Sequence, residues 1–117
     1  MRYLLLIHDD ESIFPKMTPQ ETEKLMADYG KFTEELRSAG AFKDAARLRF
    51  VSTATTVRVR GGKTLATDGP FAETKEQLGG FYMIDVKDLD EAIKWASKIP
   101  SARLGCVEVR PVWEMSH

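Results

Sequence analysis

Two apolar strand patterns, each followed by a capped helix, constrain the fold of this chain more than any other feature. The first covers residues 3–8; the sequence TPQE, a capping box with proline at the first helical position, then starts a helix over 18–39. The second covers residues 80–86, and the sequence DLDE starts a helix that Pro100 ends. Apolar residues recur at helical spacing in both helices, so each helix has one face to bury.

Four further strand patterns complete the order of elements. Residues 45–51 and 105–113, which follow the two helices, alternate apolar with charged side chains. Residues 55–60 and 63–67 flank a Gly-Gly pair and predict a two-residue hairpin. Two right-handed strand–helix–strand units with this hairpin between them predict a single α+β domain over all 117 residues, with an antiparallel sheet and both helices on one face.

The strand patterns at 3–8 and 80–86 carry large apolar side chains on both faces. The face away from the helices would expose on the order of several hundred Å² of apolar surface, more than a soluble monomer usually tolerates. At about 25 cal/mol per Å², covering that face contributes several kcal/mol before association costs. We therefore predict a homodimer in which the two uncovered sheet faces pack together. The alternative is that residues 9–17 or the hairpin fold back over this face.

Composition excludes several classes of protein. A net charge of −1 argues against a nucleic-acid partner, and the lone Cys106 excludes an internal disulfide. The longest apolar run, residues 3–7, is far shorter than the ~20 residues of a membrane-spanning helix, and it lacks the length of a signal peptide. We therefore expect a cytoplasmic protein with no membrane partner. The sequence has no phosphate loop, dinucleotide fingerprint, nucleophile elbow or zinc motif, so we expect no cofactor.

The stretch 67–86 begins with a tight Asp-Gly-Pro turn. The proline predicts a short helical turn over 71–78, which a second Gly-Gly pair ends. In one interpretation Asp68 caps this turn. In the other, the segment holds Asp68, Glu73 and Lys75 at the rim of a pocket.

That stretch also carries a family resemblance. The sequence DGPFAETKE is followed by GFY at 80–82, and the chain opens with MRYLLLI and ends close to VEVRPV. Together these sequences resemble the DGPF-signature subgroup of the YCII-related family over nearly the whole chain. The resemblance implies a ferredoxin-like two-layer α+β sandwich that assembles as a dimeric α+β barrel. Proteins resembling this chain are often linked to alternative sigma-factor systems, which leaves open a non-catalytic accessory or regulatory scaffold.

His8 is the candidate for acid–base chemistry, because it ends an apolar strand. Shorter YCII-like proteins are associated with a His–Asp pair whose histidine lies in the first helix, but the helix over 18–39 has no histidine. We predict Asp68 as the carboxylate partner of His8, at a rim where strand end and turn meet. The alternative is a histidine that only bonds to backbone. Residues 8–11 (HDDE) cannot all point at one ion from an extended strand, so no metal site is expected.

A second set of residues is predicted to contact a ligand. Arg58, Lys75 and Arg110 have the charge to receive a carboxylate or phosphate, and Glu73 lies at the same rim; solvated faces and pairing between subunits are the alternatives. Tyr29 and Tyr82 are predicted to line an apolar pocket, or else to sit in the core. The leading hypothesis is a homodimer that binds a small organic, anionic molecule between the sheet and the first helix. Any catalysis would be cofactor-free proton transfer by the predicted His–Asp pair.

Overall fold

The computed structural model describes residues 1–115 and contains two sheets. The main sheet is antiparallel in the order β2-β5-β1-β6, and its strands are β1 (Arg2–Asp9), β2 (Phe42–Arg47), β5 (Gln77–Asp85) and β6 (Cys106–Pro111). The helices are α1 (Pro19–Ser38) and α2 (Leu89–Ser97), with three short 3-10 helices, η1 (Glu11–Lys16), η2 (Val51–Thr53) and η3 (Pro100–Arg103). Two strand–helix–strand units in this order make a ferredoxin-like α+β fold, which confirms the predicted fold class.

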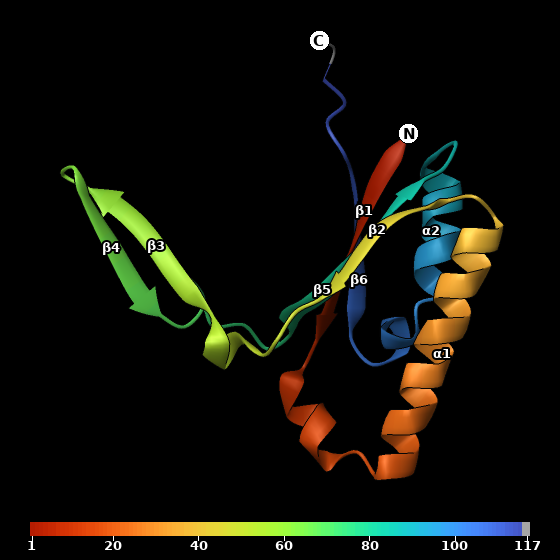
Figure 1. Cartoon of the computed structure of the whole chain (residues 1–117), viewed down its shortest axis with the longest axis horizontal. Helices are drawn as coiled ribbons and strands as arrows, with labels where there is room; N and C mark the ends of the chain where they lie inside the picture. The colour runs from red at the N-terminus through yellow and green to blue at the C-terminus, as the bar shows by residue number, and fades with distance from the viewer. Residues whose placement is uncertain (116–117) are drawn as a thin grey trace.

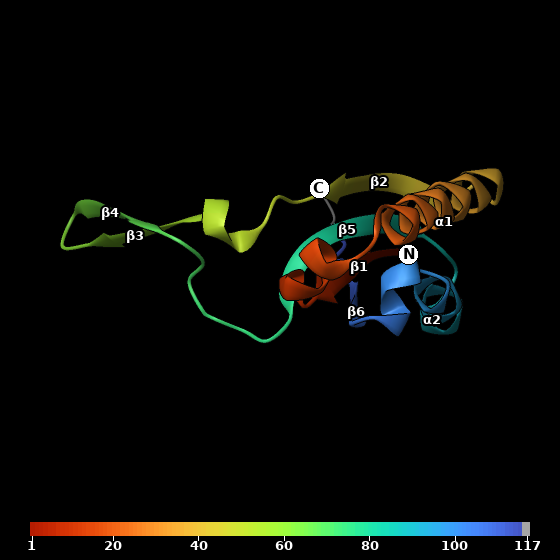
Figure 2. The same ribbon diagram turned by 90° about the horizontal axis from the view of Figure 1, so that it is seen from below.

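The core lies between the main sheet and the two helices, which cover the same face of that sheet (Figures 1 and 2). Leu5 of β1, Ile84 of β5, Leu36 of α1 and Ala92 of α2 belong to one buried cluster, and none of them is exposed to solvent. These four elements come from both strand–helix–strand units. The two units therefore share one hydrophobic core.

The other face of the main sheet is also apolar, as the sequence predicted. Leu4 lies opposite Met83 and Leu6 lies opposite Phe81 on neighbouring strands, and all four side chains are partly exposed. Neither α1 nor α2 covers them (Figure 2). We call the surface formed by these four residues the open face.

The predicted capping box at the start of α1 is confirmed. The Thr18 hydroxyl accepts a hydrogen bond from the Glu21 backbone N–H at 3.1 Å, and the Glu21 carboxylate accepts one from the Thr18 N–H at 2.9 Å. We expect Thr18→Ala to lower the free energy of unfolding by about 1 kcal/mol in urea titrations, because the bond from the Glu21 N–H to the hydroxyl is lost. Thr22→Ala, one turn further along an exposed part of α1, is the matched control and should leave stability unchanged or slightly raised.

The hairpin forms a separate two-stranded sheet of β3 (Thr55–Arg60) and β4 (Lys63–Asp68). Gly61 and Gly62 both have positive φ, which is the geometry of the predicted primed turn. The hairpin does not fold back onto the open face but projects away from the main sheet (Figures 1 and 2). We call residues 55–68 the arm.

The structure corrects two predicted elements. The strand predicted over 45–51 ends at Arg47, because the chain leaves the main sheet there to reach the arm. The helical turn predicted over 71–78 is absent, and β5 already begins at Gln77. The glycine pair expected to end that turn lies inside β5. Glycine is needed there because a Cβ at Gly80 would stand only 2.7 Å from the Ala46 carbonyl oxygen of β2. Close pairing of two strands thus overrides the local turn pattern.

Candidate functional site

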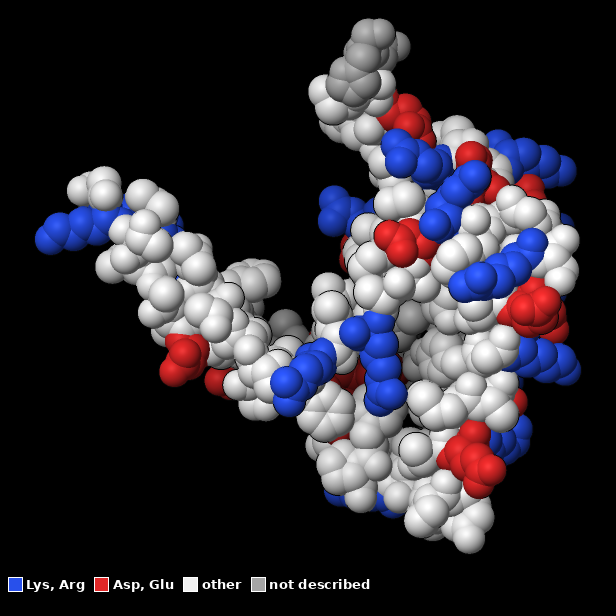
Figure 3. Space-filling model, viewed as in Figure 1, with Lys and Arg blue, Asp and Glu red and all other residues white. Residues whose placement is uncertain are grey.

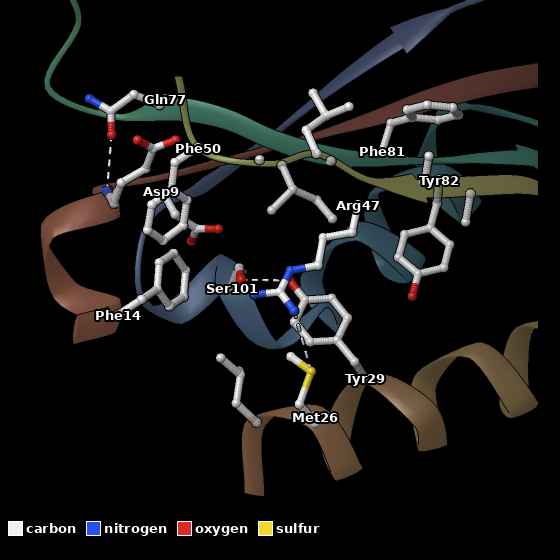
Figure 4. A pocket seen from close by; sticks show the side chains of 18 residues that line it. Asp9, Phe14, Met26, Tyr29, Arg47, Phe50, Gln77, Phe81, Tyr82 and Ser101 are labelled. Carbon is white, nitrogen blue, oxygen red and sulfur yellow. Dashed lines mark hydrogen bonds between the residues drawn. The ribbon is translucent and has the colours of Figure 1, made fainter. Parts of the chain in front are cut away.

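A cavity of about 310 Å³ lies between the main sheet and α1 (Figure 4). The sequence builds it from small residues on the sheet side, where Ala45, Gly79 and Gly80 leave room that larger side chains would fill. Its walls are mostly apolar and aromatic. The larger side chains among them are Ile7, Phe14, Leu25, Met26, Tyr29, Leu48, Phe50 and Tyr82, and the polar ones are Asp9, Glu11, Arg47, Gln77 and Ser101.

Asp9 is the buried charged group of this cavity. It ends β1 on the same face as Leu5 and Ile7, and only 6% of the residue is exposed. Its Oδ1 atom has no hydrogen-bond partner within residues 1–115. Burial raises the pKa of this carboxyl, and the nearby charge of Glu76 acts in the same direction, while the Ser101 hydroxyl opposes the shift. Asp9 is therefore more readily protonated than an exposed aspartate.

Two tyrosines from different elements are held in fixed positions around the cavity. The Tyr29 hydroxyl of α1 donates a hydrogen bond to Ser101 Oγ of η3 at 2.5 Å. The Tyr82 hydroxyl of β5 shares a 2.7 Å hydrogen bond with Thr33 Oγ1. Burial raises the pKa of Tyr29, so this phenol stays protonated at neutral pH. Both predicted aromatic residues thus line the cavity.

Arg47 brings a positive charge to the same space. Its guanidinium reaches across the cavity toward α1 (Figure 4), where its hydrogen-bond partner is the Met26 sulfur at 3.7 Å. No carboxylate of residues 1–115 lies within ion-pair distance of it. An anionic group in the cavity would give this cation the ion-pair partner that it lacks among these residues.

The outer wall of the cavity is formed where the chain leaves for the arm. The rings of Phe14 in η1 and Phe50 stack with their centroids 6.1 Å apart. Glu11 fixes this contact, because its carboxylate accepts a hydrogen bond from the Val51 N–H at 3.0 Å and its own N–H donates to Gln77 Oε1 at 2.9 Å. The segment that leads into the arm is therefore part of the cavity wall.

The predicted pair of His8 and Asp68 is not joined within one chain. His8 lies on the open-face side of β1, with Nε2 3.8 Å from the Glu108 carboxylate. Asp68 is an exposed residue at the end of β4, opposite Thr55. No hydrogen bond or ion pair in the described part of the chain links the two, and neither lines the cavity. Their joint action stays a prediction.

The other predicted ligand residues also lie away from the cavity. Arg58 is on the arm, and Glu73 and Lys75 are exposed in the segment between β4 and β5. Arg110 is exposed on β6, opposite Leu4. The structure thus brings Tyr29 and Tyr82 together but not these four charged residues, whose part in binding stays a prediction.

Neither a metal centre nor a membrane-spanning helix is found in the described part of the chain. Among residues 1–115, no group of three or more histidine, cysteine, aspartate or glutamate side chains is placed to hold a metal ion. No helix in this range is long and apolar enough to cross a membrane.

Comparison with known proteins agrees with this architecture. The family model of the YCII-related domain matches residues 1–116. An uncharacterized protein of Rhizobium meliloti (strain 1021) is 41% identical over 114 residues, a match that covers 96% of this chain and 92% of that protein. The match runs through both strand–helix–strand units and the arm between them. The chain therefore belongs to the YCII-related family.

Proposed function

We propose that this protein is a cytoplasmic homodimer that binds a small organic anion in the cavity between the main sheet and α1. The observation that carries the proposal is Asp9, a buried carboxylate in a largely apolar cavity, one of whose oxygens has no hydrogen-bond partner within residues 1–115. Leaving such an oxygen without a hydrogen bond is costly for a folded protein. A ligand that donates to this oxygen removes the cost, which makes the site a place for binding rather than for packing alone.

The cavity suits a flat, ring-containing molecule with an acidic group. Aromatic rings of Phe14, Tyr29 and Phe50 provide apolar contact, and Arg47 provides the charge for a carboxylate. Because its pKa is raised by burial, Asp9 takes up a proton more readily than an exposed aspartate does. If the protein is an enzyme, its chemistry is then a proton transfer to or from the bound molecule by Asp9, with no cofactor in that step.

The open face supports the homodimer. Its four apolar side chains are uncovered by the helices and are matched across two neighbouring strands. A second open face related by two-fold symmetry is a self-complementary surface that would remove them from water.

We expect Arg47→Gln to weaken binding of benzoate by about tenfold and to leave binding of the neutral analogue benzamide unchanged, because a charge-assisted hydrogen bond is lost. Isothermal titration calorimetry measures both. Arg49→Gln removes the same charge from an exposed residue two positions on that does not line the cavity, so it is the matched control. Equal effects of the two substitutions, or equal losses for acid and amide, would contradict a carboxylate site at Arg47.

Three further variants separate the cavity from the predicted His–Asp pair. Native mass spectrometry of the purified protein, and thermal shifts against a panel of small acids, first identify a ligand. Asp9→Asn should then weaken its binding and remove the pH dependence of binding, whereas His8→Ala and Asp68→Asn should not. If the last two abolish binding and Asp9→Asn does not, the site lies at His8 and Asp68 instead.

The exposed arginines of the arm favour a second candidate, a non-catalytic accessory or regulatory scaffold, since Arg58 and Arg60 are presented away from the main sheet. In that case no cavity variant would affect any ligand, and Arg58→Glu with Arg60→Glu would abolish capture of a partner protein. Ligand titration of the cavity variants, run beside partner capture with the arm variants, decides between the two functions.

A further inference from the structure

We infer that the arm, residues 55–68, docks on a second copy of this chain through the face that carries Val57, Val59 and Ala66. The inference rests on the proposed homodimer and goes further, because it assigns a segment of the chain to the contact between copies and ties that contact to the cavity. The occupant is a second identical chain. No other protein or nucleic acid is needed.

The arm is not a stable structure by itself. Every residue of β3 and β4 except Thr56 is exposed, and Val57 and Val59 each expose 59% of their surface. A lone two-stranded hairpin is marginally stable in water and needs a third strand or a packed surface to hold its shape. The arm has neither within residues 1–115, so the surface that holds it must come from elsewhere.

The arm has two chemically different faces. Cross-strand pairing places Val57 with Ala66 and Val59 with Thr64 on one face, whose charged residue is Asp68 at its end, opposite Thr55. The opposite face carries Arg58 and Arg60, with Lys63 beside the latter. An acidic partner would use the basic face. The face with Val57, Val59 and Ala66 instead suits an apolar surface of the second copy.

The size of the exposed surface fits a dimer. A compact monomer of 13.2 kDa would expose roughly 6,400 Å², whereas this chain exposes 8354 Å². Its radius of gyration is 16.4 Å, against about 13 Å for a compact domain of this length. The excess of roughly 1,900 Å² in each chain is the amount that each partner buries in a large, permanent dimer.

The shape of the molecule leaves room for that second chain. Figure 3 shows the arm and the body as two limbs that join at one end, with open space between them. In a two-fold dimer the arm of each copy lies on the other copy, so one contact covers two arms and two open faces at once. No single foreign partner satisfies both surfaces by one repeated contact.

Docking of the arm also bears on the cavity. Leu48 and Phe50, in the segment leading into the arm, form the outer wall of the cavity. A docked arm fixes the path of this segment, so the partner copy completes the site from outside. Ligand affinity should therefore fall when the dimer dissociates.

The test measures the dimer dissociation constant by sedimentation equilibrium for the full chain and for charged variants of the arm. Val57→Glu with Val59→Glu should raise this constant at least tenfold. Leu65→Glu adds a negative charge to the other face of the arm, across from Arg58, and should change the dimer dissociation constant by no more than about twofold. A second variant replaces residues 55–68 with Asn-Gly; it should still fold, because the Gly69 N–H already donates to the Ala54 carbonyl at 2.7 Å, the closing bond of a two-residue turn.

A photo-reactive benzoylphenylalanine at position 59 should crosslink two copies, which places the arm on the partner rather than on its own body. A monomeric parent protein overturns the inference. A dimer that survives both arm variants also overturns it. In that case Met83→Arg on the open face should dissociate the dimer, which would show that the main sheets alone form the contact. Cavity binding that persists at full affinity in an arm-less monomer would overturn the claim that the partner copy completes the site, while leaving the proposed ligand site intact.

Discussion

Gly105→Ala should lower the free energy of unfolding by about 3 kcal/mol, or prevent folding altogether. Gly105 joins η3 to β6, and a Cβ at this position would overlap the carbonyl oxygen of His8 and stand 3.1 Å from the Asp9 Cα. Both of those atoms belong to backbone, which cannot swing away as a long side chain can. The chain would have to move β6 away from β1 at the edge where Asp9 enters the cavity.

Urea unfolding followed by circular dichroism measures this loss. Gly30→Ala is the matched control, since Gly30 lies inside α1 and a Cβ there meets nothing within 4 Å. We expect it to stabilise the protein by about 0.5–1 kcal/mol, because alanine is the better helix former. If both substitutions change stability by the same amount, close approach at Gly105 does not limit the packing of β6 on β1.

The helices and the main sheet were predictable because their patterns are local. The capping box before α1 and the two-sided apolar strands β1 and β5 are each complete within a few residues. The glycine turn of the arm is local too, and the predicted two-residue hairpin is confirmed, with Arg60 opposite Lys63. The prediction that failed rested on a local pattern, and strand pairing between distant parts of the chain overrode that pattern. The Asp-Gly-Pro turn favoured a helix over 71–78, but the last two residues of that segment belong to β5, which pairs with β1 and β2.

The cavity was predicted only in part. Its place between the sheet and the first helix, and its two tyrosines, follow from helical spacing and strand alternation. Asp9 was missed as a site residue, although alternation with Leu5 and Ile7 puts it on the buried face, because it begins a run of three acidic residues that is typical of a chain leaving the sheet. Its neighbour Ser101 is bonded to Tyr29, which lies 72 residues away, and no sequence pattern announces a contact of that range.

Arg47 was missed for a different reason. In a strand that continues to residue 51, alternating arginines read as a solvated face. In the structure Arg47 is the last residue of β2 and lies opposite Gly80, on the same side of the sheet as Ala45 and Tyr82, so its side chain is directed across the cavity. The pairing register of β2 with β5, which alternation along β2 alone does not reveal, makes Arg47 a site residue.

Asp9→Asn should raise the free energy of unfolding of the ligand-free protein by about 2 kcal/mol at pH 7.5, because it removes a buried charge with an unpartnered oxygen. The sign follows from the raised pKa of Asp9 in the folded state. Between its ordinary value of 3.8 and the raised value, the folded protein holds more protons than the unfolded chain. Stability of the parent protein therefore falls as pH rises through that window, and the advantage of the asparagine variant should shrink as pH falls toward 4.

Asp10 supplies the opposite case one residue away. Hydrogen bonds from Ser12 lower the pKa of the Asp10 carboxyl in the folded state. The stabilisation that this carboxylate gives is therefore fully present at pH values above its ordinary pKa, and it is lost as the pH falls through the lowered pKa of the folded state. Asp10→Asn should thus weaken the protein at pH 7.5 and not at low pH. Equal pH profiles for the two variants would mean that Asp9 is not desolvated in solution. A stabilising Asp9→Asn that also loses its ligand would show that the chain keeps a destabilising carboxylate at this position for the sake of binding.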